Sequence, residues 1–485
     1  MSSTILWHDY ETWGIRPSVD FPVQFAAIRT DLDLNIIETS KAINWMCAIP
    51  HDYLPHPQAC LVTGITPSFS MRKGMSEPNF AKKIHAEMSV PETCVAGYNS
   101  IRFDEEVSRH LFFRNFYPVY EREYANRNSR WDIIDLVRAA YALRPEGINW
   151  PMSDEGLPIF KLEQLSNENS IEHVSAHDAL SDVHATIALA KLIKTKQPKL
   201  YDYYWKLRSK REVDKLLGKF QQTILVYISA YIGSKQGCCT LIMPICRHPH
   251  NNNSVICVDL NNPIDDLLSM TALELRESIF KRFDSKQNDD DTKANKLRLF
   301  TVAINKCPFV APLNTLSENN AERLGIDLAR CRQNYAQIAS IQTLTELCQS
   351  VYKQEDSKPI PNNIDECLYA TDFPSDADKM LTTKVRASEP EQLIAFQGGF
   401  ENEHYNSLLF RYRGRNFPFS LEEHEIRKWQ QYLQMRFYEN NKRECLSLQE
   451  YFVEIETLMS QFINVPDKLR ILQALKQHGN AIADT

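Results

Sequence analysis

The chain has 485 residues, of which 43% are hydrophobic and 24% charged, and its net charge is −7. This length exceeds what one hydrophobic core supports, so we expect two to four domains of a soluble globular protein rather than a fibrous or disordered chain. The acidic net charge alone argues mildly against a nucleic-acid partner, because such domains often carry a basic surface.

The N-terminus has no basic region before its short apolar stretch, and the longest apolar run, residues 224–232, is about half a membrane span. We therefore expect neither a signal peptide nor a membrane partner. The twelve cysteines are scattered and form no Cys-x-x-Cys pair, which favours reduced, structural cysteines in a cytoplasmic protein.

The first part of the chain alternates between strand and helix patterns. The predicted strands cover residues 5–11, 23–29, 35–49 and 93–98, and the predicted helices cover residues 79–88, 104–116, 131–143 and 176–196. This order predicts an α/β domain over residues 1–197, in which helices flank a mixed sheet.

The pattern changes after residue 197. Short strands are predicted over residues 223–231, 239–243, 254–259 and 298–302, with one helix over residues 271–282 and an exposed polar loop over residues 284–296. We therefore predict a small barrel-like domain over residues 198–352. Residues 353–366 contain Pro359 and Pro361 and indicate a linker.

The last predicted domain, residues 353–485, is α-helical. Its predicted helices cover residues 375–384, 389–396, 404–412, 421–437, 446–463 and 467–478. The whole chain is thus predicted to be a multidomain α/β protein.

The first chemical signal is Asp9 and Glu11 on the opening strand. Side chains two residues apart on a strand share a face, and two adjacent carboxylates repel each other unless a cation lies between them. Hard divalent cations such as Mg²⁺ prefer oxygen ligands. The pair is therefore a candidate metal site.

Two further signals lie at helix starts. Asp104 follows the fourth predicted strand, where an aspartate also suits a helix cap. His177 and Asp182 lie at the start of the helix predicted over residues 176–196, and both can face one cleft if His177 lies before or in the first turn.

Taken in chain order, the acidic pair, the later aspartate and the His-x4-Asp motif resemble the DEDDh exonucleases, a superfamily with an RNase H-like fold. The segment Thr63-Gly64-Ile65-Thr66 extends the match, because the corresponding loop of this superfamily lies near the terminal nucleotide. Its position after the third predicted strand suggests a loop there too.

Longer segments resemble the bacterial exodeoxyribonuclease I family over nearly the whole chain, from Leu6 into the helical domain. The segments are residues 25–31, 142–151, 304–308 and 415–418. The resemblance implies an exonuclease domain, an SH3-like β-barrel domain and a C-terminal α-helical domain. It weakens over residues 233–250 and 284–296.

The family resemblance implies a 3′→5′ exonuclease that hydrolyses single-stranded DNA to 5′-mononucleotides with two magnesium ions, for which manganese can substitute. Asp9 would bridge the ions, Glu11 and Asp182 would complete the site of the attacking water, and Asp104 would support the second ion. His177 would be the general base.

Basic and aromatic residues are the candidates for holding the strand, because cations neutralise phosphates and aromatic rings stack on bases. Between Lys191 and Lys219 there are ten basic and only three acidic residues, interleaved with tyrosine and tryptophan; the alternative is that these aromatics belong to a core. The expected substrate contacts are Glu11, Thr63, Gly64, Ile65, Phe160 and Lys161. The expected DNA contacts are Arg109, Tyr120, Tyr124, Arg138, Arg144, Glu163 and Lys306.

The resemblance also implies a monomer that acts in DNA repair and recombination and binds the acidic C-terminal tail of single-stranded-DNA-binding protein. Arg144 can belong to that tail site as readily as to the DNA path. Two other functions stay open on the sequence: an RNA-directed exonuclease of the same superfamily, and a non-catalytic single-strand-binding adaptor.

Overall fold

The computed structural model describes residues 3–172, 178–284, 299–353, 360–439 and 446–484. These residues fold into two compact units. The first unit comprises residues 1–129, 174–184 and 359–485, and the second comprises residues 130–173 and 185–358. The predicted domain division at residues 1–197, 198–352 and 353–485 stays a prediction.

The first unit is built around a mixed sheet. Four of its strands follow the order β3-β2-β1-β4, where β1 is Thr4–Thr12, β2 is Pro22–Thr30, β3 is Ile43–Met46 and β4 is Thr93–Gly97. β1 pairs with β2 in antiparallel and with β4 in parallel orientation. β2 and β4 are buried along their whole length, as expected for a sheet covered on both faces.

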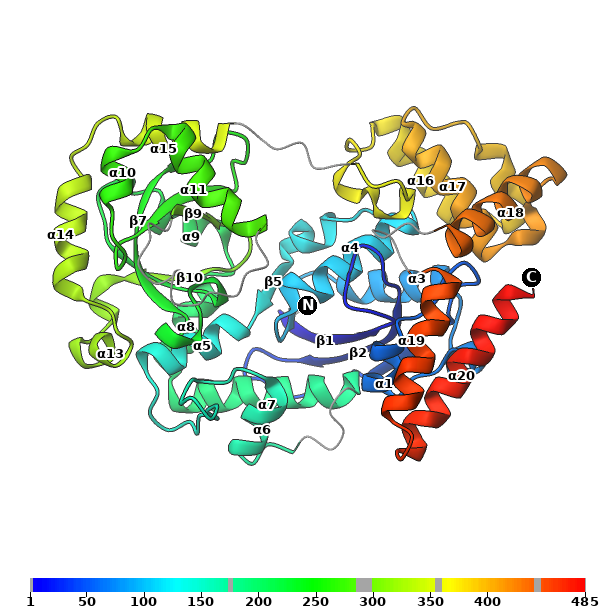
Figure 1. Cartoon of the computed structure of the whole chain (residues 1–485), viewed down its shortest axis with the longest axis horizontal. Coiled ribbons are helices and arrows are strands. Elements are labelled where there is room, and N and C mark those ends of the chain that lie inside the picture. The colour runs from blue at the N-terminus through cyan, green and yellow to red at the C-terminus, as the bar shows by residue number, and fades with distance from the viewer. Residues whose placement is uncertain (1–2, 173–177, 285–298, 354–359, 440–445, 485) are drawn as a thin grey trace. The chain divides into compact units, whose positions relative to one another are not determined.

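Helices α3 (Glu77–Met88) and α4 (Asp104–Arg114) pack against this sheet (Figure 1). Their apolar side chains form one core with those of β1, β2 and β4. The core includes Leu6, Phe25, Phe80, Ile84, Val95, Leu111 and Phe112. The apolar spacing of α3, with Phe80, Ile84 and Met88 at intervals of four, places these side chains on the buried helix face.

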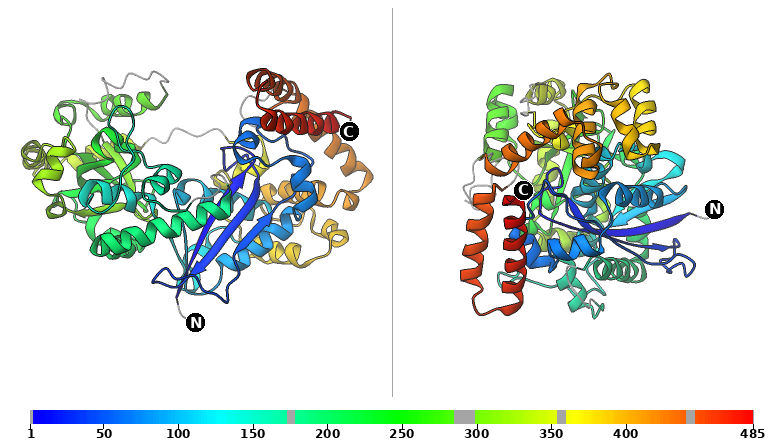
Figure 2. Two further views of the ribbon diagram at one scale, coloured as in Figure 1. Left: turned by 90° about the horizontal axis from the view of Figure 1, so that it is seen from below. Right: turned by 90° about the vertical axis from the view of Figure 1, so that its right-hand side faces the viewer.

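Helices from the end of the chain also belong to the first unit. α19 (Leu448–Gln461) and α20 (Pro466–Ala483) lie side by side (Figures 1 and 2) and share a core with residues near β2 and with α1 (Pro57–Thr63). Ser447 caps α19 in a box with Glu450, and Pro466 opens α20 at a position where its missing N–H is not needed.

Two predictions for the first part of the chain were wrong in detail. The strand predicted over residues 35–49 is confined to β3, because the polar residues before it form exposed turns. The helix predicted from Trp131 begins at Ile134, since Ser129–Asp132 is strand β5. The loop expected at residues 63–66 is present and joins α1 to α2 (Pro67–Lys73).

The second unit contains a five-stranded antiparallel sheet with the order β10-β6-β7-β8-β9. The strands are β6 (Leu225–Ile228), β7 (Cys239–Arg247), β8 (Ser254–Asp259), β9 (Leu299–Ala303) and β10 (Phe309–Pro312). The four strands predicted from the sequence are confirmed. β10 was missed because its apolar run is short and ends at a proline.

The prediction of a single helix between residues 198 and 352 was wrong. Besides α11 (Ala272–Asp284), this stretch contains helices that the sequence analysis missed: α8 (Pro198–Lys206), α9 (Lys210–Leu217), α10 (Asp265–Ser269), α13 (Glu318–Arg323), α14 (Leu328–Ile338) and α15 (Leu344–Lys353). In α14 only Cys331, Asn334 and Ile338 are buried. Its buried face therefore contains too few apolar residues for their spacing to indicate a helix. The predicted loop after Asp284 lies outside the described residues.

The helices predicted near the C-terminus are confirmed. They are α16 (Asp376–Ala387), α17 (Glu403–Asn416) and α18 (Glu423–Tyr438), together with α19 and α20. The predicted helix over residues 389–396 is a 3₁₀ helix, Pro390–Phe396. Across the described parts of the chain, no helix is both long enough and apolar enough to cross a lipid bilayer.

A buried cluster of charges joins distant segments inside the first unit. The Arg415 guanidinium of α17 donates to both carboxylate oxygens of Asp52, at 2.8 and 2.7 Å, and also to Asp365. The three side chains are at most 5% exposed. Burial alone would raise the pKa of Asp52, but the charge and hydrogen bonds of Arg415 outweigh it and lower that pKa to about 2.

Replacing Asp52 with asparagine should lower the free energy of unfolding by about 3–5 kcal/mol, because it leaves a buried guanidinium without its full counter-charge. Since the folded pKa of Asp52 lies below its unfolded value of about 3.9, the stabilisation should be complete above that value and disappear as the pH falls through the folded pKa. Urea denaturation at a series of pH values measures both effects.

The control is Asp376→Asn, which breaks the exposed pair with Lys379 and should change stability by no more than about 0.5 kcal/mol. Equal losses in the two variants would contradict the role given to the Arg415 cluster.

Candidate active site

Strand β1 presents the first two acids of the site. Asp9 and Glu11 are two residues apart and therefore project from the same face of the sheet. The register with β2 places Asp9 opposite Ala26 and Glu11 opposite Gln24. Glu11 is 9% exposed and Asp9 is half-buried. Both residues lie on strand β1 rather than in a loop.

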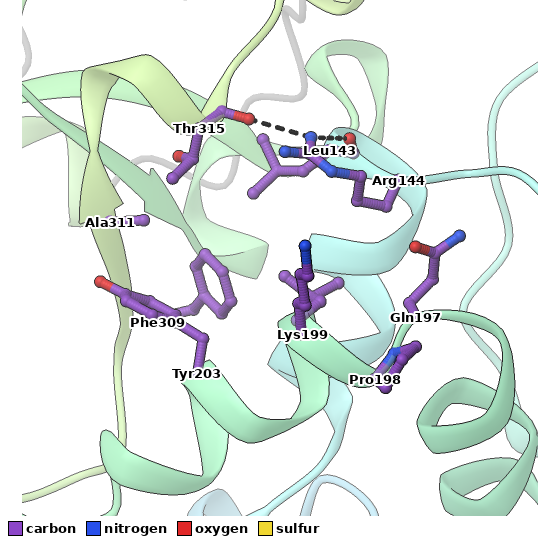
Figure 3. A pocket seen from close by; sticks show the side chains of 10 residues that line it. Leu143, Arg144, Gln197, Pro198, Lys199, Tyr203, Phe309, Ala311 and Thr315 are labelled. Atoms are coloured by element: carbon purple, nitrogen blue, oxygen red, sulfur yellow. Dashed lines mark hydrogen bonds between the residues drawn. The ribbon is translucent and has the colours of Figure 1, made fainter.

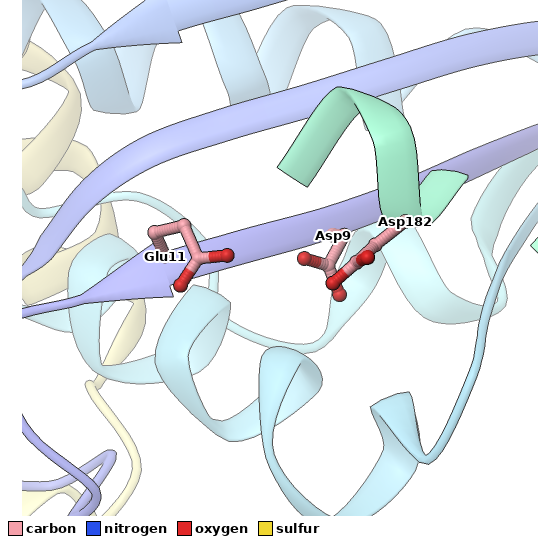
Figure 4. Close-up of side chains that lie close together, drawn as sticks. All are labelled: Asp9, Glu11 and Asp182. Atoms are coloured by element: carbon pink, nitrogen blue, oxygen red, sulfur yellow. The ribbon is translucent and has the colours of Figure 1, made fainter. Parts of the chain in front are cut away.

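Helix α7 (Ala179–Lys196) supplies the third acid. Asp182 lies in its first turn, and one carboxylate oxygen from each of Asp9, Glu11 and Asp182 lies within 4.8 Å of the others (Figure 4). Within the described ranges this is the one group of three such ligands. The arrangement confirms the sequence-based expectation that these residues come together.

Asp104 lies beside this group without belonging to it. It is the first residue of α4, is 4% exposed, and its Oδ1 accepts the backbone N–H of Tyr10 at 3.1 Å. The N-cap of α4 is Phe103, so the cap that the sequence suggested for Asp104 is wrong. Instead, Asp104 is bonded to the strand residue that lies between Asp9 and Glu11.

The electrostatics of the group favour a cation. Burial raises the pKa of Asp9 well above its usual range, and Asp104, Glu11, Asp182 and Asp178 raise it further. Burial, followed by the charges of Asp182, Asp104 and Asp178, raises the pKa of Glu11 to about 9. A divalent cation would offset this repulsion, and carboxylate oxygens are the ligands that hard cations prefer.

His177, predicted as the general base, lies outside the described residues. Asp178, the next residue, is described, and its backbone carbonyl accepts the N–H of Asp182 at 3.1 Å in the first turn of α7.

A cavity of about 600 Å³ contains two of the predicted substrate contacts. Thr63 ends α1, Gly64 turns the chain at φ 70°, and Ile65 follows before Thr66 caps α2. Thr63 and Ile65 line the cavity together with apolar side chains that include Trp45, Phe69 and Met75. The positive φ explains the glycine, because other residues rarely adopt it.

Three predicted DNA contacts lie elsewhere in the first unit. Arg109 is 6% exposed and forms ion pairs with Glu106 and Glu123, each at 2.8 Å. Its guanidinium also lies 5.2 Å from the ring centre of Tyr120. Tyr124, by contrast, is 68% exposed. Arg109 thus has its charge compensated, whereas Tyr124 offers a free ring face.

The second unit contains the remaining predicted contacts. Arg138 is 8% exposed, bonds Asp135 at 2.6 Å and lies 6.0 Å from the ring centre of Phe160. The exposed residues are Lys161 and Glu163, at the start of α6 (Leu162–Glu168), and Lys306. Contact with DNA stays a prediction for all of these residues.

Arg144 borders a separate cavity of about 440 Å³ in the second unit (Figure 3). Its guanidinium donates to the carbonyl of Thr315 at 3.0 Å and to that of Leu143. Besides Arg144, Lys199 gives the cavity a positive charge. Most of the other lining residues are apolar: Leu143, Pro198, Leu200, Tyr203, Phe309 and Ala311.

The aromatic residues between Lys191 and Lys219 are mainly structural. Tyr201 and Tyr204 are buried, and the Tyr204 hydroxyl contacts the carbonyls of Asp132 and Cys307 at 2.9 and 2.8 Å. The core alternative is therefore correct for these two tyrosines.

Sequence reasoning missed Gln24 and Asp178. Gln24 is 5% exposed on β2, and its side-chain nitrogen donates to Asp178 Oδ1 at 2.9 Å. The sequence offered two signals: Gln24 is a polar residue inside an apolar strand, and Asp178 is an acid directly after His177. Neither signal forms a recognisable motif by its spacing.

Models of known families match three successive parts of the chain. An exonuclease model matches residues 6–190, the exonuclease I SH3-like domain matches residues 208–354, and the exonuclease I C-terminal domain matches residues 362–482. The exonuclease domain implies dependence on a divalent metal, and the acidic group described above fits one.

Two similar curated proteins are exodeoxyribonucleases I. The chain is 43% identical to that of Haemophilus influenzae, over 97% of each protein. It is 42% identical to that of Escherichia coli K12, over 99% of this chain and 98% of the relative.

Solved structures of E. coli exonuclease I, 40% identical to this chain, share its fold. The complex with a dA16 oligonucleotide has a TM-score of 0.92 and covers 99% of this chain and all of its own. A zinc-bound complex with single-stranded DNA has a TM-score of 0.91 and full coverage of both chains. A structure of SSB and exonuclease I with the inhibitor CFAM has a TM-score of 0.89, at 99% and 100% coverage.

These matches confirm the predicted fold class, an RNase H-like exonuclease domain, an SH3-like domain and a C-terminal helical domain. Together with the acidic group on β1 and α7, they show that the chain belongs to the exodeoxyribonuclease I family.

Proposed function

We propose that this chain removes nucleotides one at a time from the 3′ end of single-stranded DNA and releases 5′-mononucleotides, in DNA repair and recombination. The observation that carries the proposal is the group of three carboxylates within 4.8 Å, in a family whose E. coli member was solved with dA16. The proposed substrate is DNA rather than RNA because that complex contains a DNA oligonucleotide.

We infer that two Mg²⁺ ions, or Mn²⁺ in their place, are held by the acidic group. Asp9, Glu11 and Asp182 would hold the ions, and Asp104 would support them directly or through water. Bound ions lower the pKa of the attacking water and stabilise the leaving 3′ oxygen. His177 would accept the proton of that water.

Substrate positioning is proposed for the residues around the 600 Å³ cavity. Thr63 and Ile65, with Gly64 between them, would contact the last nucleotide; Phe160 and Lys161 are also proposed as substrate contacts. The contacts proposed along the strand are Arg109, Tyr120, Tyr124, Arg138, Glu163 and Lys306.

We also propose that the Arg144 cavity binds the acidic tail of single-stranded-DNA-binding protein. Arg144 and Lys199 offer positive charge beside an apolar floor, which suits a peptide with carboxylates and an apolar end. The structure of SSB with exonuclease I supports such a partner. This proposal assigns Arg144 to the tail rather than to the DNA path.

The three predicted domains, a monomeric state and a cytoplasmic location remain proposals. For the location, the support is chemical: the eleven cysteines of the described residues are buried free thiols, as expected in a reducing compartment.

The substitution Asp182→Asn should lower the rate of nucleotide release by at least about 100-fold, because it removes the charge of a metal ligand. Substituting a residue that merely holds such a ligand typically lowers activity by about 10–100-fold. A 5′-labelled single-stranded DNA oligomer, followed on a sequencing gel, should shorten from its 3′ end with the wild-type protein and stop shortening on addition of EDTA. The control Asp202→Asn changes an exposed acid of α8 and should retain wild-type activity.

Matched RNA and duplex oligomers complete that experiment. Faster shortening of RNA than of DNA would favour the RNA-directed alternative. Binding of the strand without any release of nucleotides, with Mg²⁺ present as well as with EDTA, would instead indicate an adaptor protein.

Metal binding should depend on pH. Because the pKa of Glu11 is raised to about 9 without a cation, Glu11 is protonated at neutral pH and must release its proton when an ion binds. The affinity for Mn²⁺ should therefore rise from pH 6 to pH 9, and isothermal titration calorimetry in buffers of different ionisation enthalpy should detect proton release. An affinity independent of pH would refute the assignment of Glu11 as a ligand.

Arg144→Ala should weaken binding of an acidic tail peptide by about 10-fold or more, the loss usual for an arginine at the centre of an interface. Fluorescence anisotropy with a labelled tail peptide measures the affinity, and exposed Arg332 on α14 provides the control, Arg332→Ala. Equal affinity for the Arg144 variant and the wild type would place the tail elsewhere.

A further inference from the structure

Gln24 connects two segments of the first unit through one side chain. Its amide nitrogen donates to Asp178 Oδ1 at 2.9 Å and to Asn44 Oδ1 at 2.9 Å. The Gln24 side chain lies on β2 and is only 5% exposed, so water competes little for these bonds. The contacts link β3 and β2 to the residue immediately before α7.

The chemistry of the partners determines which way the amide of Gln24 points. An ionised carboxylate only accepts hydrogen bonds, so only the amide nitrogen of Gln24 can face Asp178. That nitrogen has two hydrogens, which is enough for Asp178 and Asn44 together. No acidic or apolar side chain at position 24 can make both bonds.

The same bonds are close to the metal ligands. Gln24 lies directly opposite Glu11 in the register of β1 and β2, so the two side chains share a face of the sheet. On the helix side, Asp178 lies four residues before Asp182, and its carbonyl accepts the Asp182 N–H at 3.1 Å. Residues four apart on a helix lie on the same face.

We propose that Gln24 and Asp178 form a latch that holds the first turn of α7 against the sheet and so positions Asp182 beside Asp9 and Glu11. The inference rests on the proposed function, because the latch serves the same metal site. Gln24 and Asp178 are positioning residues: they act through Asp182. Errors of about 1 Å in such groups can reduce rates by about 100-fold.

The test compares Gln24→Ala, Asp178→Ala, the double variant and Asp178→Asn. Each alanine variant should lower kcat on single-stranded DNA by about 10-fold or more and leave KM within about 3-fold. The double variant should be no slower than the slower single variant, because both remove one interaction. Asp178→Asn keeps an oxygen that accepts the Gln24 N–H, so it should retain kcat within about 3-fold of the wild type.

A second measurement does not depend on activity. Mn²⁺ affinity, measured by calorimetry, should fall by about 10-fold in Gln24→Ala, which leaves the charge of Asp178 in place, and by at least as much in Asp178→Ala. The control Gln434→Ala changes an exposed glutamine of α18 and should alter neither measurement. Thermal unfolding of each variant verifies that it is folded.

Different results would overturn the latch. Loss of activity in Asp178→Asn equal to that in Asp178→Ala would show that the charge of Asp178 matters, not its hydrogen bond. A large increase in KM would assign Gln24 and Asp178 to substrate binding, since both also line the 600 Å³ cavity. If wild-type protein releases no nucleotides, the proposed function fails, and Mn²⁺ affinity still decides whether the latch exists.

Discussion

Mutual repulsion among carboxylates is the constraint on which the site depends. Asp9, Glu11 and Asp182 lie within 4.8 Å of each other, and Asp104 and Asp178 add to the negative field. A fold that buries such a group without a cation loses stability, because each added charge raises the cost of ionising the next. The sheet and α7 hold these acids where repulsion would separate them. The same repulsion provides the driving force for binding a divalent ion.

The surrounding fold resists this repulsion through rigid elements. β1 is held by β2 on one side and by β4 on the other, and Asp104 is tied to the Tyr10 backbone. Further out, Arg415 joins Asp52 to Asp365, so that the C-terminal helices of the first unit support the same sheet. A site assembled from separate parts of the chain thus requires long-range contacts that no local motif encodes.

The sequence therefore predicted the acids better than their supports. Asp9 and Glu11 could be placed on one face because strand alternation is a local rule, and the helix with Asp182 had a clear pattern. Asp104 was predicted as a site residue, but its bond to the Tyr10 backbone was not, because that bond spans 94 residues. Gln24 was missed because its partner Asp178 is distant in the sequence. Helix α14 was missed because it buries too few apolar residues to give a helical pattern. Buried Tyr204 likewise shows that a ring near lysines need not face a ligand.

The acidic group on β1 and α7 is proposed to bind the metal that acts on the 3′ end of a DNA strand. Crystals of the protein with Mn²⁺ and a single-stranded oligomer whose 3′-terminal linkage resists hydrolysis, measured at the manganese absorption edge, test this assignment directly. The account predicts anomalous peaks at about 2.0–2.3 Å from oxygens of Asp9, Glu11 and Asp182, with the 3′-terminal phosphate beside them. An ordered 3′ end far from these carboxylates, with no peak among them, would contradict it.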